Sequence, residues 1–323
     1  MTCRRFFKMI GTGPCLFFIV YFLLYINTGY AQNDSTVTSS GKVITLREVV
    51  VRSNLNVAAF IERVKEDTSF YKAFRNLHVL GYTSLNDVQI FDKKGKPKAS
   101  LSSRTRQHRE KGCRWNEIVD EKTTGDFYNG SHEYNYYTAE LYASLFFASD
   151  TICGETNIVK GTTFSTKGKS KTDKHKEQLK MLFFNPGKRI PGLPFMGNKV
   201  ALFDEEVSSL YDFVIDMELF KQEMCYVFRM IPRTDLSDGE KSAIVINEMI
   251  TWFRIDNWQI VARNYDLSYK TGVYDFDVHM EVEMVQFENY VVPKVLRYNG
   301  NWDVMFKKRE RAVFTATLFD FKQ

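Results

Sequence analysis

The sequence has few of the residues from which metal centres and nucleophilic sites are built. Its five histidines are scattered along the chain: His78, His108, His132, His175 and His279. No two of them have the spacing of metal ligands on one helix, and "HEYNYY" at His132 has Tyr136 where a zincin motif needs its second histidine. A GxSxG elbow, a P-loop and a GxGxxG turn are all missing. We therefore predict a non-enzyme with no cofactor, no metal and no catalytic residues.

Cysteine and proline are also scarce. Seven prolines in 323 residues argue against a chain dominated by linkers. Three of the five cysteines lie beyond the N-terminal region, Cys113, Cys153 and Cys225, and none of them has a CxxC or zinc-type spacing. An exported chain can join two of these cysteines and leave one thiol. We predict the simpler alternative, in which all three are buried free thiols.

The N-terminus has an apolar run, Cys15 to Ile26, that is short for a bilayer span. Three basic residues precede the run, and the small residues Gly29 and Ala31 follow it. This order is typical of a secretory signal peptide. We predict that residues 1–31 are a signal peptide, cleaved after Ala31, although a retained anchor helix is the alternative. The protein is then exported, periplasmic or outer-membrane-associated, and not integral to a membrane after cleavage.

The charge balance gives no support for nucleic-acid binding. Without its leader cations the chain has 41 Lys and Arg against 39 Asp and Glu. A basic loop, "STKGKSKTDKHK", includes Lys167, Lys169 and Lys171. Such a loop is typical of a solvated hairpin tip. Its functional interpretation is a contact with anionic lipid headgroups or with an acidic envelope protein.

The rest of the chain predicts helices and strands in one folded unit. Residues 32–42 are polar and rich in Ser and Thr, which predicts a flexible segment. Residues 43–323 are predicted to form a single α+β domain. A helix is expected from about Val57 to Phe74, with an apolar stripe at helical spacing that includes Phe60 and Val64. Shorter helices are expected at 137–149 and 173–184.

Twelve segments have the composition or the alternation of β-strands, which predicts about eleven strands in the chain. They lie at 43–52, 77–91, 98–110, 113–123, 199–205, 211–219, 223–231, 244–256, 258–269, 273–287, 290–298 and 304–321. Sequential strands usually pair with one another. We therefore predict one large curved antiparallel sheet, a half-barrel-like meander, covered by two or three helices.

The segment "YDFDVHMEVEM", residues 274–284, has the clearest alternation in the chain. A strand points successive side chains to opposite faces. One face carries five apolar residues: Phe276, Val278, Met280, Val282 and Met284. The other carries four carboxylates and an imidazole: Asp275, Asp277, His279, Glu281 and Glu283. We predict that the first face is buried and that the second is wet.

The acidic face has three possible interpretations: a metal site, an acid/base pair, or a charge-paired sheet surface. Carboxylates on one face of a strand are about 6.5–7 Å apart, too far to chelate one small cation without ligands from other strands. The last predicted strand carries cations in the same alternation, Lys307, Arg309 and Arg311. We predict cross-strand ion pairs between the two rows.

The segment "INEMITWFRIDNWQIVARNYDLSY", residues 246–269, carries a resemblance to a known family. One strand ends in an aromatic-plus-acid turn, within "WFRIDNWQIV", and leads into the next strand. With the leading amphipathic helix and the long meander, this pattern resembles the periplasmic lipoprotein-carrier, or outer-membrane lipoprotein-sorting, superfamily over about residues 57–321. The resemblance implies a half-barrel with a concave sheet, a helical lid and a hydrophobic cavity that binds lipid chains.

The question of function therefore concerns the apolar face of residues 274–284. Our first hypothesis is that this face, with Phe60 and Val64 of the helix, lines a cavity for a lipid or lipoprotein acyl chain. The alternative is a filled core in a ligand-free structural or interaction protein of the cell envelope. A hydrolase with dispersed catalytic residues is the third hypothesis, because such sites are defined by geometry rather than by sequence order.

Overall fold

The computed structural model of the protein describes most of the chain. The described residues are 35–39, 42–46, 57–92, 94–148, 150–159, 181–184, 187–190, 196–270, 274–304 and 309–323. The predicted signal peptide, the three lysines Lys167, Lys169 and Lys171, and much of the predicted helix at 173–184 lie outside them. Within these ranges no helix is long and apolar enough to cross a bilayer.

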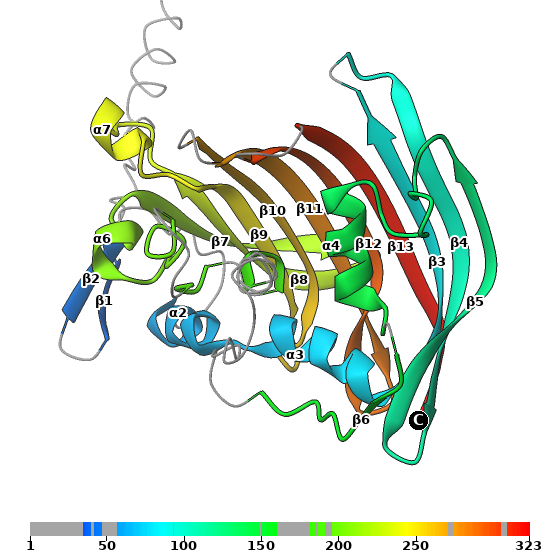
Figure 1. Ribbon diagram of the computed structural model, residues 1–323. Helices are drawn as coiled ribbons and strands as arrows, with labels where there is room; N and C mark the ends of the chain where they lie inside the picture. The colour runs from blue at the N-terminus through cyan, green and yellow to red at the C-terminus, as the bar shows by residue number, and fades with distance from the viewer. Residues whose placement is uncertain are drawn as a thin grey trace, which may run out of the picture. The chain divides into compact units, whose positions relative to one another are not determined.

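Eleven strands form one open antiparallel sheet (Figure 1). In chain order they are β3 (Gly81–Phe91), β4 (Pro97–Glu110), β5 (Cys113–Thr124), β6 (Ile152–Cys153), β7 (Tyr211–Phe220), β8 (Glu223–Pro232), β9 (Ile246–Arg254), β10 (Ile260–Lys270), β11 (Tyr274–Phe287), β12 (Tyr290–Val304) and β13 (Glu310–Lys322). Their order across the sheet is β6-β5-β4-β3-β13-β12-β11-β10-β9-β8-β7. The predicted fold class, an α+β chain with a large antiparallel meander, is confirmed. The pairing of β13 with β3, which joins the two halves, was not predicted.

Two of the predicted strands differ from the structure. Residues 199–205 form turns that lead into α6 (Glu205–Ser208), because Asp204 has the extended backbone of a helix N-cap and its carbonyl accepts from Ser208 N at 2.8 Å. The strand predicted at 304–321 begins only at Glu310. Val304 instead ends β12, because it pairs with Tyr274 at the start of β11.

The hairpin of β1 (Ser35–Ser39) and β2 (Lys42–Leu46) forms a second, two-stranded sheet. β1 falls within the segment predicted to be flexible, and β2 lies at the start of the strand predicted at 43–52.

The helix predicted from Val57 to Phe74 is two helices, α2 (Val57–Glu66) and α3 (Ser69–Asn76). The break lies at Asp67, whose side-chain Oδ1 accepts from Ser69 N at 3.0 Å and so replaces a helical backbone bond. A 3-10 turn, η1 (Leu77–Val79), follows α3. The apolar stripe predicted for this region is buried on both helices, for example at Phe60 and Phe74.

The helix predicted at 137–149 is α4 (Tyr137–Phe146). Its N-terminus is fixed to the sheet by Glu310 of β13, whose carboxylate accepts from the backbone N–H groups of Tyr137 and Thr138 at 2.8 and 2.9 Å. An anion at this end of a helix is favourable, because the free N–H groups carry a partial positive charge. Residues 181–184 are also helical, and a short helix, α7 (Asp238–Lys241), lies between β8 and β9.

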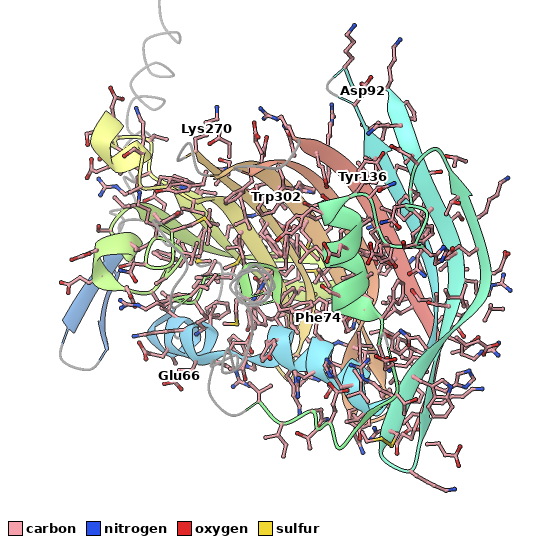
Figure 2. All side chains as sticks on the ribbon, in the orientation of Figure 1. Glu66, Phe74, Asp92, Tyr136, Lys270 and Trp302 are labelled. Carbon is pink, nitrogen blue, oxygen red and sulfur yellow. A yellow bond between two sulfur atoms is a disulfide. The ribbon has the colours of Figure 1, made fainter. Side chains whose placement is uncertain are left out.

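The helices α2, α3 and α4 lie against one face of the sheet (Figure 1). Apolar side chains of both layers form one continuous core, in which Phe74 of α3 and Trp302 of β12 take part (Figure 2). We call this covered face the inner face. Burial of this area removes apolar surface from water and is the main source of stability.

Candidate functional site

The five apolar residues of β11 all lie on the inner face. Phe276, Val278, Met280, Val282 and Met284 are buried and belong to the main core. The prediction that one face of residues 274–284 is buried is therefore confirmed. Sequence alternation sufficed here, because β11 keeps one register with β10 along its whole contact.

Phe60 and Val64 of α2 belong to the same core. The Phe60 ring does not stand over β11, however. Its centroid lies 5.7 Å from that of Phe228, 6.2 Å from Phe253 and 5.1 Å from Trp258. The seven candidate cavity residues thus belong to one core, but Phe60 packs on β8, β9 and Trp258 rather than on β11.

Residues 181–184 contact β10 and β12. The hydroxyl of Tyr265 on β10 lies 2.7 Å from the Phe183 carbonyl oxygen, to which it donates, and 2.9 Å from Met280 Sδ. Burial raises the pKa of Tyr265 well above its ordinary value, so the hydroxyl keeps its proton as a donor. The Tyr265 hydroxyl therefore contacts both Met280 and the covering segment.

Methionine is concentrated in this core to a degree that the sequence pattern did not indicate. Of eleven methionines in the chain, six are buried there. They are Met181, Met196, Met230, Met249, Met280 and Met284. Two come from the covering segments and four from strands β8, β9 and β11. The thioether is flexible and polarisable, so this region of the core can repack around another apolar group.

The inner face changes character towards β3 and β4. Asn86 of β3 donates to the hydroxyls of Ser103 and Thr105 at 3.2 and 3.3 Å and accepts from the Tyr142 hydroxyl of α4 at 2.6 Å. All four residues are buried. A buried polar network of this kind fixes α4 over β3 and β4. This part of the inner face is therefore more polar than the part formed by β11.

The acidic face of β11 is a charge-paired surface, but its partners differ from those predicted. Glu283 binds Lys221 and, at 3.0 Å, Arg297 of β12, which also lies 3.2 Å from Glu281. The predicted pairing of this row with Arg309 and Arg311 is wrong, because β12 separates β11 from β13. Lys307 lies outside the described residues, and Arg309 is 3.8 Å from Asp303 instead.

His279 completes this surface. Its Nδ1 lies 2.6 Å from Asp266 Oδ1 and its Nε2 lies 3.3 Å from Glu281 Oε1. Burial lowers the pKa of His279, but the hydrogen bonds to the two carboxylates outweigh it and hold the pKa above its ordinary value. In the part of the chain that the structure describes, no three His, Cys, Asp or Glu side chains gather as metal ligands.

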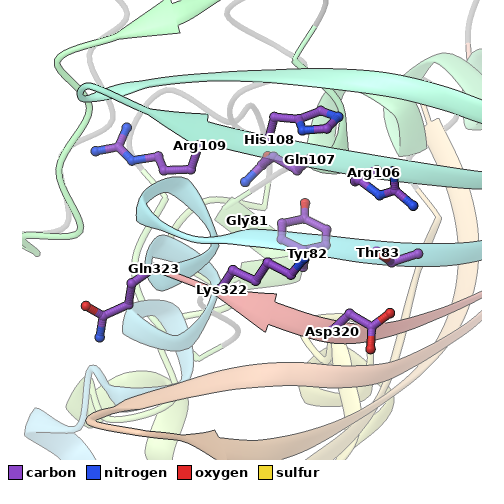
Figure 3. Close-up of a pocket in the computed structure, with 10 residues that line it drawn as sticks. All are labelled: Gly81, Tyr82, Thr83, Arg106, Gln107, His108, Arg109, Asp320, Lys322 and Gln323. Atoms are coloured by element: carbon purple, nitrogen blue, oxygen red, sulfur yellow. The ribbon is translucent and has the colours of Figure 1, made fainter.

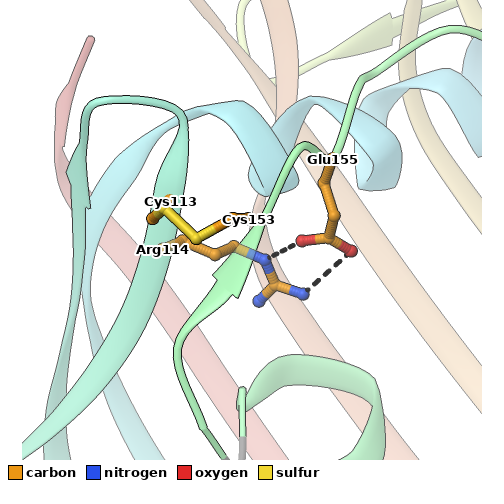
Figure 4. Close-up of a disulfide and its surroundings, with 4 residues drawn as sticks. All are labelled: Cys113, Arg114, Cys153 and Glu155. Carbon is orange, nitrogen blue, oxygen red and sulfur yellow. Dashed lines mark hydrogen bonds and ion pairs between the residues drawn. A yellow bond between two sulfur atoms is a disulfide. The ribbon is translucent and has the colours of Figure 1, made fainter.

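The prediction of three free thiols is wrong for two cysteines. Cys113 of β5 and Cys153 of β6 form a disulfide (Figure 4), and Cys225 is a buried free thiol. The two strands place these residues opposite each other in antiparallel register. Spacing along the chain could not reveal this, because 40 residues separate the two cysteines.

A buried charge cluster lies beside the disulfide. Glu155 accepts from Arg114 Nε and, at 3.3 Å, from Nη2 (Figure 4). His78 lies 2.7 Å from Glu155 through Nδ1. Burial lowers the pKa of His78 despite this carboxylate, so a neutral His78 donates the bond at pH 7. Burial alone raises the pKa of Glu155, but the bonds from His78 and Arg114 outweigh it and lower the pKa to about 2.

Acid should therefore lower the free energy of unfolding, because it protonates Glu155. A depressed carboxyl pKa gives stability that is complete above the ordinary value of 4.5 and is lost as the pH falls through about 2. We expect the wild type to lose about 2 kcal/mol of stability in acid through this group, after allowing for solvent screening. Glu155→Gln should not show this loss, because its side chain has no carboxyl group to protonate. Denaturant unfolding of both proteins at several pH values between 5.5 and 2.5 measures it. Parallel stability curves for the two proteins would contradict the assignment.

A polar pocket of about 310 Å³ lies at one end of β3, β4 and β13 (Figure 3). Its walls include Arg106, His108, Asp320 and Lys322. Arg106 and His108 both contact Glu117, at 3.7 and 2.6 Å. None of the candidate cavity residues lines this pocket, and its polar walls do not suit an acyl chain.

No protein-family model matches the chain, and no curated protein matches it. Several solved structures are similar. A DUF1329 family protein from Desulfovibrio piger is 12% identical, with 78% of this chain and 92% of that chain covered and a TM-score of 0.24. A domain assigned to outer membrane lipoprotein sorting from Vibrio parahaemolyticus is 9% identical, with 82% and 89% covered and a TM-score of 0.25. A LolA superfamily protein from Nitrosomonas europaea is 8% identical, with 79% and 93% covered and a TM-score of 0.23.

The predicted resemblance to lipoprotein-sorting proteins thus recurs among solved structures. TM-scores this low support no transfer of function. The function has to follow from the residues of this chain.

Proposed function

We propose that the protein is an exported, non-catalytic protein of the cell envelope that binds a lipid or lipoprotein acyl chain between the sheet and its covering helices. The wall on the sheet side is the apolar face of β11, from Phe276 to Met284, and Phe60 and Val64 contribute from α2. The observation that carries this proposal is the group of six buried methionines on the inner face of β8–β11 and in the segments that cover it.

Methionine supports an adaptable binding wall better than a fixed core. Its three rotatable bonds and soft sulfur let a core repack without large gaps or strain. The cover over this wall includes several pieces of the described chain, among them α2, α3 and residues 181–184 and 196–202. An acyl chain can enter when one piece moves outward, and its CH₂ groups then replace protein contacts at about 0.8 kcal/mol each.

The disulfide and the leader support the same compartment. Disulfides persist in oxidising environments such as the periplasm and are rare in the cytosol. The pattern of residues 1–31 is that of a signal peptide. The proposed contacts of Lys167, Lys169 and Lys171 with lipid headgroups or an acidic partner remain predictions outside the described residues.

A variant at the centre of the wall tests the proposal. Replacing Met280 by Trp fills the space that an acyl chain needs, so we expect the affinity of the protein for an acyl-chain probe to fall by about tenfold or more. The larger side chain should also lower the stability by about 1–3 kcal/mol through overpacking. The measurement is titration of a fluorescent long-chain lipid probe. The matched control is Met224→Trp, because Met224 is 45% exposed at the start of β8. Equal affinity of both variants and the wild type would contradict the proposed site.

A second candidate function, docking of an envelope protein, is favoured by the edge of the sheet. β6 pairs only with Cys113 and Arg114 of β5, so within the described chain residues 115–124 have a free edge. Ile118 and Val119 on this edge are 59% and 40% exposed. Free edges can accept a strand from a partner. Co-purification of a defined envelope protein that is lost in Val119→Pro would support this candidate.

A further inference from the structure

A charged side chain, Arg263, lies on the inner face among the core residues of β9–β11. Arg263 of β10 is 6% exposed and is in phase with the core residues Tyr265 and Leu267. Among the described residues its one hydrogen bond runs from Nε to the Thr251 hydroxyl, at 2.9 Å. Its guanidinium carbon lies 4.5 Å from the centre of the Phe70 ring on α3. A guanidinium has five N–H donors, and in the described part of the chain only the Nε donor has a hydrogen-bond acceptor.

The carboxylate that faces Arg263 compensates its charge incompletely. Asp67 Oδ2 lies 3.9 Å from Arg263 Nη2, beyond the length of about 2.7–2.9 Å that charge-assisted hydrogen bonds have. This Oδ2 is buried and has no hydrogen-bond partner within the described chain. The other oxygen, Oδ1, accepts from Ser69 N at the start of α3. Asp67 therefore ends one helix and begins the next, rather than binding Arg263 closely.

Lys188 adds a second cation to the same place. It donates to the Lys65 carbonyl at the end of α2. Burial lowers the pKa of Lys188, Asp67 opposes this change, and the charge of Arg263 reinforces it. Burial also lowers the pKa of Arg263 in spite of Asp67. The charge of Asp67 thus acts on both cations, and Glu66 also acts on Lys188. An additional anion is favourable beside two cations in a region of low polarity.

The position of Arg263 connects this charge to the proposed acyl wall. Arg263 stands in register with Val282 of β11 on one side and with Thr251 of β9 on the other. Val282 is one of the candidate wall residues. A ligand whose acyl chain lies along the methionines of β9 and β11 can therefore place its head beside Arg263.

We propose that Arg263 and Lys188 bind the anionic headgroup, a carboxylate or a phosphate, of the acyl-bearing ligand. This inference rests on the proposed acyl-chain function and specifies its ligand class as an anionic amphiphile. The headgroup oxygens take the place of Asp67 Oδ2, which gives up no hydrogen bond on leaving. The planar guanidinium matches the paired oxygens of either group, and desolvated charge pairs are strong in surroundings of low dielectric constant.

The test compares probes that differ only in head charge. The full chain is expressed, purified as the host processes it, and titrated with cis-parinaric acid and with its methyl ester. We expect the acid to bind about tenfold more tightly or better, as one charge-assisted hydrogen bond of roughly 1.5–3 kcal/mol implies. Arg263→Met should remove this preference and leave ester binding unchanged. The same comparison of phosphatidic acid with diacylglycerol distinguishes a phosphate head from a carboxylate.

A second variant distinguishes an effect on headgroup binding from an effect on folding. Asp67→Asn removes the competing carboxylate but keeps a side-chain oxygen to accept from Ser69 N, so the affinity for the acid should rise. The matched control, Arg297→Met on the wet face of β12, should leave both affinities unchanged. Equal wild-type affinity for acid and ester, or an unchanged preference in Arg263→Met, would overturn the headgroup site while the acyl proposal stands. If neither probe binds the wild type, both proposals fail.

Discussion

Replacing Cys113 and Cys153 together by serine should lower the free energy of unfolding by about 4 kcal/mol. The disulfide closes a loop across a sequence separation of 40 residues. Without it the unfolded chain gains the conformational freedom of that loop, and the entropy of loop closure sets the size of the effect. The loss is a large fraction of the total stability of a typical folded protein.

The folded state should also change near this bond. The disulfide holds residues 152–157 against α3, where Arg75 donates to the Thr156 carbonyl at 2.6 Å and Asn157 donates to the Asn76 side chain at 2.8 Å. Arg114 and Glu155 lie in the same contact (Figure 4). Once the covalent link is lost, hydrogen exchange in residues 152–157 and in α3 should become faster.

Guanidinium unfolding of the wild type with and without reductant, and of the double variant, measures the effect. Reduction of the wild type should reproduce the stability of the double variant, and reductant should not affect the variant further. A wild type that is equally stable when oxidised and reduced would contradict the assignment.

Replacing Gly300 by alanine should destabilise the protein by about 3 kcal/mol, at the upper end of ordinary overpacking. Gly300 lies on β12, opposite Val278 of β11. A Cβ at this position would stand 1.9 Å from Tyr298 Oη and 2.3 Å from Tyr298 Cζ. The glycine therefore provides the space that the Tyr298 ring occupies.

The Tyr298 ring has little freedom to move away. It is buried, it stacks on Phe314 with 4.5 Å between ring centroids, and its hydroxyl accepts from Trp302 Nε1. A new methyl group must displace the ring from these contacts or separate β12 from its covering layer. Either change costs packing energy, because protein interiors are as dense as molecular crystals.

Gly239→Ala is the matched control, since a Cβ there meets no atom within 4 Å. Gly239 lies within the exposed helix α7, where alanine is expected to be neutral or stabilising by about 0.4–1 kcal/mol. Thermal or denaturant unfolding compares the two variants. If Gly300→Ala retained the stability of the wild type, the position of Tyr298 over Gly300 would be wrong.

Local sequence patterns predicted the elements whose own residues decide their structure. The alternation from Phe276 to Met284 predicted the buried face of β11, and the apolar stripe that includes Phe60 and Val64 predicted the buried side of the first helical region. Residues 199–205 were mistaken for a strand because Val200, Ala201 and Leu202 are buried in turns without forming one. A short apolar run does not distinguish these structures.

Long-range contacts could not be obtained from the same patterns. The pairing of β13 with β3, the Cys113–Cys153 bond and the partners of Glu283 each depend on how distant segments meet. Arg263 did leave a local signal. It occupies a core-phase position in "VARNYDLSY", two residues before Tyr265, and a charge at such a position indicates a buried partner or a ligand. The concentration of methionine became meaningful only when the sheet brought β8, β9 and β11 together.

The most direct test of the acyl-binding account is native mass spectrometry of the purified wild-type chain, followed by solvent extraction and lipid analysis. The account predicts a bound species with the mass of an acyl-bearing lipid, released on unfolding and replaced by an added long-chain fatty acid. A chain that carries no lipid and shows no saturable uptake of any long-chain probe would contradict it, and would leave the ligand-free envelope protein as the function.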